Sequence, residues 1–161
     1  MRGRAVVVWG WVGPLLVTVF GAVLRFGRLG VPHAIVFDET YYVPDAYGIL
    51  RHGVEIKHVK NAPALLAHGS THILAGTGSE YVAHPPLGKI MIAAGEWLFG
   101  LTPFGWRFAV AVAGSLAILM TARIVRRMTH STLLGCTAGM LLALDGLEFV
   151  LSRTAILDIF L

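Results

Sequence analysis

Apolar runs separated by short polar clusters divide the chain, and their lengths predict helices that cross a membrane. The first run, about residues 5–24, carries no charge. About 20 apolar residues suffice to span a bilayer as an α-helix. A cleaved signal peptide is the alternative, but this run exceeds the usual signal core and residues 25–28 offer no small-residue cleavage site. We therefore expect an uncleaved membrane helix.

The C-terminal part of the chain contains three further apolar segments. We expect a second membrane helix over about residues 104–122, with Arg107 near its outer end. Two short helices should follow, over about 131–145 and 147–161. The last segment breaks off inside an apolar stretch without a helix stop, so we expect a truncated helix and an N-terminal fragment of a longer chain.

Arginines predict how these helices are oriented in the membrane. Arg2 and Arg4 precede the first helix, and the arginines at positions 123, 126 and 127 follow the second. Because positively charged flanks stay in the cytoplasm, both regions should be cytoplasmic. The N-terminus is then cytoplasmic, and the long segment over about 25–103 is an outer loop.

Two helices are expected within this outer loop. Pro44 and Gly53 bracket a short one, since proline is favoured at the start of a helix and glycine just after its end. Pro85 opens a second, amphipathic helix that places Lys89 and Glu96 on a face away from its apolar residues. This helix fits the headgroup plane or a re-entrant path. Residues 75–79, rich in glycine, are predicted to be a flexible connection.

Composition supports a membrane protein and excludes one class of partner. Hydrophobic residues make up 56% of the chain and charged residues only 14%. The net charge of +4 comes from scattered basic residues rather than from a basic patch with interleaved aromatics. No nucleic acid partner is therefore expected. The single cysteine, Cys136, excludes an internal disulfide.

The adjacent acids Asp38 and Glu39, which follow closely on the first helix, are the strongest candidates for chemistry. A carboxylate at the membrane surface can accept a proton from an attacking hydroxyl. The alternative is a solvated loop or a helix cap. His68 and His72 have the spacing of metal ligands on a helix, but surface histidines fit the glycine-rich context better than a zinc site does. A divalent metal is compatible with the acids, although no motif specifies one.

Arginines at membrane depth are the second group of candidates. Arg107 and Arg153 are too costly to leave unpaired in hydrocarbon, so each should pair with an acid or bind an anion. Asp145, Glu148 and Asp158 are possible acidic partners of Arg153. A lipid phosphate is the other possibility, because a departing phosphate needs electrostatic stabilisation.

The order of these motifs resembles that of the protein O-mannosyltransferases. The residues that carry the resemblance are Asp38-Glu39, the hexapeptide from His84 to Lys89, Gly105-Trp106-Arg107, Ser152-Arg153 and Leu157-Asp158. Together they cover nearly the whole chain, which resembles the N-terminal third of a bacterial, actinobacterial member.

This resemblance implies a fold, a reaction and roles for the site residues. The fold would be an all-α membrane protein of the GT-C type, a multi-pass helical bundle with amphipathic helices in a long first outer loop. The reaction would be inverting transfer of mannose from a polyprenyl-phosphate donor to Ser or Thr hydroxyls of exported proteins. Asp38 would be the catalytic base and Glu39 would position the base or the acceptor. The donor-binding candidates are His84, Lys89, Arg107 and Arg153, and Pro85-Pro86 could make the hexapeptide architectural instead.

The partners implied are the donor, acceptor proteins, membrane lipid and the protein translocation machinery, at the plasma membrane. Two rivals stay open at this stage. One is another GT-C transferase that uses a different sugar or acceptor, and the other is a non-enzymatic transporter or scaffold subunit.

Overall fold

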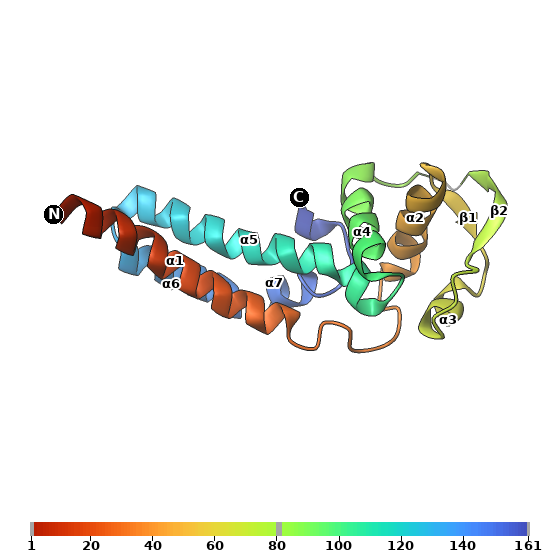
Figure 1. The fold of residues 1–161 in the computed structure, drawn as a ribbon, viewed down its shortest axis with the longest axis horizontal. Helices are drawn as coiled ribbons and strands as arrows, with labels where there is room; N and C mark the ends of the chain where they lie inside the picture. The colour runs from red at the N-terminus through yellow and green to blue at the C-terminus, as the bar shows by residue number, and fades with distance from the viewer. Residues whose placement is uncertain (1, 80–81, 161) are drawn as a thin grey trace.

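A bundle of three long helices joins a smaller layer of short elements in the computed structural model, which describes residues 2–79 and 82–160. The bundle consists of α1 (Arg2–Phe26), α5 (Pro103–Thr129) and α6 (Thr132–Leu144). α1 and α6 run in the same direction and α5 runs against both (Figure 1). The predicted all-α class is confirmed, with one small sheet added to it.

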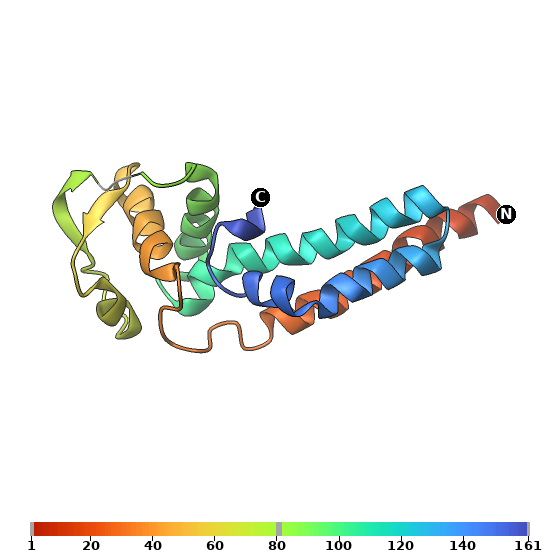
Figure 2. The same ribbon diagram turned by 180° about the vertical axis from the view of Figure 1, so that it is seen from behind.

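The smaller layer lies beyond one end of the bundle. It contains α2 (Glu39–His52), β1 (Ile56–His58), α3 (Ala62–Ala67), β2 (Leu74–Ser79) and α4 (Pro86–Phe99). β1 and β2 pair antiparallel. α7 (Gly146–Leu151) and a short 3-10 turn, Asp158–Phe160, lie where the two parts meet. Seen from behind, residues 27–38 connect α1 to α2 along the edge of the molecule (Figure 2).

Length and apolar composition make α5 a candidate membrane helix. Among the described residues, it is the one helix long and apolar enough to cross a bilayer, whereas Gly10–Phe26 and Thr132–Leu144 are shorter apolar helical stretches. Large apolar side chains point outward from all three helices, for example Leu16, Met120 and Leu141. Such a surface needs lipid or further protein to cover it.

Contacts near the far end of the bundle join the start of α1 to the end of α5. The Arg123 guanidinium donates to the backbone oxygen of Gly10 at 2.7 Å. It also lies over the Trp11 ring, 3.5 Å from the centroid. The N-terminal end of α1 and the C-terminal end of α5 are therefore on the same side of the molecule, opposite α2 and α4 (Figure 1).

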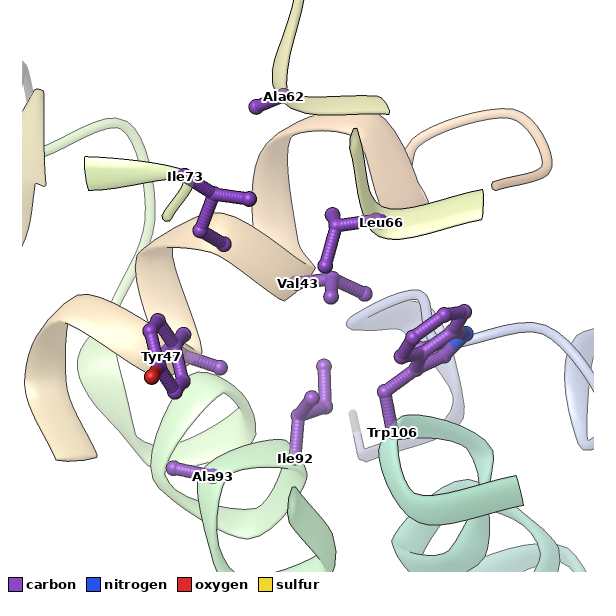
Figure 3. Packing of buried hydrophobic residues seen from close by; sticks show 10 residues of the cluster. Val43, Tyr47, Ala62, Leu66, Ile73, Ile92, Ala93 and Trp106 are labelled. Atoms are coloured by element: carbon purple, nitrogen blue, oxygen red, sulfur yellow. The ribbon is translucent and has the colours of Figure 1, made fainter. Parts of the chain in front are cut away.

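The main hydrophobic core holds the smaller layer against the start of α5. Val43 and Tyr47 from α2 face Ile92 and Ala93 from α4, and Trp106 from α5 closes the cluster (Figure 3). Ala62, Leu66 and Ile73 cover the cluster from the side of α3 and the sheet. This core fixes α2, and α2 carries the residues of the site described below.

Several predicted elements need correction. The helix expected from Pro44 begins at Glu39, so Pro44 lies inside it. Buried packing of Val43 and Pro44 holds this turn together despite the missing proline N–H. Residues 75–79 are not a flexible connection, because they belong to β2 and pair with β1.

The helices near the C-terminus also differ from expectation. α5 extends past the predicted residue 122 to Thr129. The helix expected over 147–161 is wrong in extent, since α7 ends at Leu151. Beyond it the backbone N–H of Ala155 donates to the Glu39 carboxylate at 3.0 Å, a contact that a continuing helix would not make. α6 and α7 meet at Asp145, whose side chain caps α7 by accepting from Glu148 N at 2.8 Å.

Close packing of α4 on α5 gives a first testable prediction. Gly95 is buried, and a methyl group there would overlap the backbone oxygen of Gly105. We expect Gly95→Ala to lower the free energy of unfolding of the full-length protein by about 1–3 kcal/mol. Denaturant unfolding measures this change. Gly146→Ala is the matched control because open space surrounds Gly146, and equal stability of the two variants would contradict the packing argument.

Candidate active site

A pocket of about 580 Å³ opens in the smaller layer beside the start of α2. Its lining includes two carboxylates, Asp38 and Asp45, and two imidazoles, His58 and His84, together with Tyr41, Tyr42 and Ala83. Asp38, Tyr41, Tyr42 and Asp45 follow helical spacing, so one face of α2 supplies most of the wall.

Asp38 occupies the N-cap position of α2, but its side chain makes no capping hydrogen bond. The backbone oxygen of Asp38 instead accepts the N–H groups of Tyr41 and Tyr42 at 3.0 and 3.1 Å. The cap that was the alternative to a chemical role is therefore absent at this side chain. The half-buried carboxylate faces the pocket without a helix donor to hold it.

Glu39 lies behind Asp38, fully buried, and does not line the pocket. Its Oε1 accepts from Arg107 Nε at 2.7 Å and from Ala155 N at 3.0 Å. Its Oε2 accepts from Arg107 Nη2 at 2.8 Å and from Val36 N at 2.9 Å. Four donors thus surround this carboxylate, which is compatible with a positioning role and removes it from direct contact with a ligand in the pocket.

Arg107, on the second turn of α5, holds the loop that precedes Asp38 through hydrogen bonds. Besides Glu39, it donates to the backbone oxygens of Leu29, Pro32 and Ala34 at 3.3, 3.0 and 2.9 Å. Its planar guanidinium suits this use, because five N–H groups in a fixed fork can reach several acceptors at once. The loop therefore delivers Asp38 to the pocket from a position fixed by α5.

Arg153 lies after α7 and is held by backbone oxygens. It donates to Leu24 and Gly27 at 2.7 and 2.9 Å and to Arg28 at 3.3 Å. Of the possible acidic partners of Arg153, Glu148 pairs with Arg25 instead. Among residues 2–79 and 82–160, no ion pair joins Arg153 to Asp145 or Asp158. Arg107 and Arg153 line one small cavity of about 190 Å³ with Phe149 and residues of the α1–α2 loop.

The two candidates of the hexapeptide have different environments. His84 is exposed at the pocket, with its ring 5.7 Å from that of Tyr42 in an edge-to-face arrangement. Lys89 is fully buried and forms ion pairs with Asp45 at 2.9 Å and with Glu55 at 3.0 Å. Pro85 and Pro86 start α4 and so present Lys89 to α2.

The charged groups shift one another's proton affinity. Burial lowers the pKa of Lys89, but hydrogen bonds to Asp45 and Glu55 outweigh burial and raise that pKa above its ordinary value. Burial raises the pKa of Asp45, and Lys89 offsets part of this shift. Burial and the nearby Asp38 also raise the pKa of Tyr42, so its phenol keeps a proton to donate.

The sequence alone did not single out Asp45, His58 or Glu55 as site residues. Asp45 could have been found from its spacing of two helical turns after Asp38, had the start of α2 been placed correctly. Within residues 2–79 and 82–160, no group of three metal-ligating side chains comes together. We assign no metal to this pocket.

Glu96 is a buried acid outside this pocket, and it predicts a pH dependence of stability. It is 3% exposed on α4, and neither carboxylate oxygen has a hydrogen-bond partner in the described part of the chain. Burial raises the pKa of Glu96 well above its ordinary value. The folded protein therefore binds a proton that the unfolded chain releases above about pH 4.3.

Stability should accordingly fall as pH rises, by up to about 1.4 kcal/mol per pH unit, until the pKa of folded Glu96 is passed. Glu96→Gln should remove this component, so the stability of the variant relative to the wild type should rise from about pH 5 upward until the pKa of folded Glu96 is passed. Thermal unfolding of the full-length protein across this range measures the difference. Asp158→Asn, which changes an exposed acid, serves as the control, and parallel pH curves for Glu96→Gln and wild type would refute the prediction.

Fold and pocket together define an α-helical membrane protein with a carboxylate-lined pocket beyond one end of its helix bundle. Sequence comparison supplies the family. Residues 15–161 match the family described as dolichyl-phosphate-mannose-protein mannosyltransferase, and the chain belongs to that family of membrane enzymes. The resemblance inferred from the motifs is confirmed.

Several relatives carry the name polyprenol-phosphate-mannose–protein mannosyltransferase. The protein from Mycolicibacterium smegmatis is 41% identical over 156 residues, which are 94% of this chain and 27% of the relative. The Mycobacterium tuberculosis protein is also 41% identical, over 94% of this chain and 26% of its own length. The Corynebacterium glutamicum protein is 40% identical over 91% of this chain and 26% of its own length. The chain therefore spans about a quarter of the length of these curated relatives.

A more distant relative has another name. An undecaprenyl phosphate-alpha-4-amino-4-deoxy-L-arabinose arabinosyl transferase from Pseudomonas aeruginosa is 32% identical over 77% of this chain and 23% of its own length. No solved structure matches the chain.

Proposed function

We propose that the full-length protein transfers mannose from a polyprenyl-phosphate donor to Ser or Thr hydroxyls of exported proteins, with inversion at the anomeric carbon. The observation that carries this proposal is the uncapped Asp38 carboxylate in the wall of a 580 Å³ pocket. A general base needs a carboxylate that is free of other hydrogen bonds, and this carboxylate must lie within reach of the hydroxyl it activates. The Asp38 side chain makes no capping hydrogen bond and so meets the first requirement. Family membership and the names of the relatives supply the donor and the acceptor class.

In the proposed reaction, the acceptor hydroxyl oxygen attacks the anomeric carbon from the side opposite the phosphate. Asp38 takes the hydroxyl proton as the new carbon–oxygen bond forms. The bond between the sugar and the phosphate oxygen breaks, and its electron pair leaves with the polyprenyl phosphate. A β-linked donor then gives an α-linked product.

Arg153 is the better of the two arginines for holding the departing phosphate. The charge of Arg107 is already paired with Glu39, and its remaining donors go to three backbone oxygens. Arg153 has no carboxylate partner within 4.0 Å among residues 2–79 and 82–160, so its charge is available to an anion. A guanidinium whose charge is not paired with a carboxylate would stabilise the charge that develops on the leaving phosphate.

His84 and Lys89 take different roles in this proposal. His84 borders the pocket and is available to the donor or the acceptor. Lys89 is buried behind Asp45 and has no path to a lipid phosphate, so its role is to hold the pocket wall. Glu39 acts as a positioning residue through Arg107 and Val36 rather than through the substrate.

A plasma-membrane location with the pocket on the outer side completes the proposal. The start of α1 and the end of α5, where arginines cluster, share one end of the bundle, while the pocket layer lies at the other (Figure 1). Cytoplasmic arginines then put the pocket outside, where a polyprenyl carrier presents its sugar and exported proteins pass. Membrane lipid and the translocation machinery would be neighbours of this site.

Transfer by the full-length protein tests the proposal. Purified protein with polyprenyl-phosphate mannose and a Ser/Thr acceptor peptide should give mannosylated peptide. The similarity to an arabinosyl transferase favours a second candidate, a lipid-linked-sugar transferase with another sugar or acceptor. Transfer of the sugar to a lipid with none to the peptide would establish that candidate instead.

A further inference from the structure

Asp45 supplies a second carboxylate to the pocket wall, and one of its two oxygens lacks a hydrogen-bond donor among the described residues. Its residue is 5% exposed and lines the pocket together with Asp38. Its Oδ2 accepts from Lys89 Nζ at 2.9 Å. Its Oδ1 is buried and has no hydrogen-bond partner among residues 2–79 and 82–160. A buried acceptor without a donor is costly, so a ligand hydroxyl that donated to the Asp45 carboxylate would remove this cost.

Lys89 fixes the orientation of Asp45 and leaves excess negative charge behind the wall. This lysine is fully buried and bridges Asp45 to Glu55, so two carboxylates share one ammonium group. The excess charge and burial both favour a ligand that donates hydrogen bonds to Asp45. They also disfavour an anion, because Asp38 adds a further carboxylate to the same wall. The donor phosphate therefore does not fit beside Asp45.

A polyhydroxyl group does fit. His58 also lines the pocket, and its Nδ1 is buried without a partner in the described chain. Tyr42 adds a protonated phenol, and the rings of Tyr41 and Tyr42 offer apolar surface to the C–H groups of a sugar. A hexose carries neutral hydroxyls that can donate to the fixed Asp45 carboxylate, and it carries C–H groups that can pack against the aromatic rings. The pocket wall therefore suits a hexose.

We propose that Asp45 accepts hydrogen bonds from hydroxyls of the transferred sugar and so determines which sugar is used. This inference rests on the proposed function and extends it to the specificity of the same site. Lys89 acts through Asp45 as a positioning residue. Asp38 acts on the acceptor hydroxyl, whereas Asp45 acts on the sugar, two helical turns further along α2.

Two matched substitutions in the full-length protein test this role. Asp45→Asn and Glu55→Gln each remove one acidic partner of Lys89, but only Asp45 lines the pocket. Each variant is assayed with polyprenyl-phosphate mannose and with donors that lack one hydroxyl at the 2, 3, 4 or 6 position. We expect wild type and Glu55→Gln to use at least one deoxy donor about 10-fold or more less well than mannose. Asp45→Asn should have a lower kcat/KM for mannose and should lose that preference.

The outcomes separate failure of this inference from failure of the proposed function. If the wild type transfers mannose but Asp45→Asn keeps the wild-type preference among donors, the role of Asp45 is refuted. A change confined to the KM of the acceptor peptide, or an equal effect of both substitutions, refutes it as well. If Asp45→Asn does not accumulate, the wild-type donor series decides, since equal use of all deoxy donors overturns the proposal. Absence of any mannose transfer by wild type would instead count against the proposed function itself.

Discussion

Replacing Asp38 with asparagine is expected to abolish detectable mannose transfer by the full-length protein while leaving its fold intact. General-base catalysis contributes about 10²- to 10⁴-fold to rate, and an amide cannot take up the proton. The fold should survive because Asp38 is half-buried and its side chain makes no capping bond to α2. The change removes a negative charge from the pocket wall and no hydrogen bond from the helix.

Peptide mannosylation at saturating donor, normalised to the amount of folded protein in the membrane, measures this effect. Asp158→Asn is the matched control, because it makes the same chemical change at an exposed position outside the pocket. Transfer by Asp38→Asn within a few-fold of the wild-type rate would remove Asp38 from the role of base. The uncapped Asp38 carboxylate in the pocket wall would then no longer support the proposed reaction.

The part of this fold that could be predicted from sequence depends on local patterns. Apolar runs with at most one charge identify the helices of the bundle, since hydrophobic length and periodicity are read from neighbouring residues. The proline pair at the start of α4 and the glycine after α2 mark one end of each helix for the same reason. The start of α2 was misplaced because Pro44 imitates a helix start, while the true start at Glu39 is stabilised by residues from α5 and from the segment after α7.

The partners of the charged residues could not be predicted, because they are distant in sequence. Arg107 lies 68 positions from Glu39, and Lys89 lies 44 positions from Asp45. Only the packed core brings these elements together. The sequence shows that the positive charges of Arg107, Lys89 and Arg153 need partners. It offers several acids as candidates and does not show which acid each residue contacts. For Arg153, backbone oxygens at the end of α1 and in the loop after it are the acceptors. No pattern of side chains in the sequence predicts such backbone contacts.

Breaking the buried pair between Glu39 and Arg107 is the second large effect we expect. Glu39→Gln should lower the free energy of unfolding of the full-length protein by about 3–5 kcal/mol, since an unpaired buried charge is left behind. The geometry adds to this loss. All four hydrogen bonds to the Glu39 carboxylate come from N–H donors, two at each oxygen, so the amide nitrogen of glutamine would face two donors whichever oxygen it replaced.

Arg107→Lys tests the same pair from the other side. A lysine keeps the positive charge but cannot reach Glu39 and the backbone oxygens of Leu29, Pro32 and Ala34 together. We therefore expect a loss of stability in the same range as for Glu39→Gln. Because both residues belong to one network, the double variant should lose less than the sum of the single losses.

Comparison with Asp38→Asn then separates positioning from catalysis. Denaturant unfolding in detergent gives stability, and peptide mannosylation gives activity, for the same preparations. Glu39→Gln and Arg107→Lys should lose stability and activity together, because the loop they hold carries Asp38 into the pocket. Asp38→Asn should lose activity alone. A Glu39→Gln protein as stable as the wild type but inactive would mean that Glu39 acts on the substrate, although it lies behind the pocket wall.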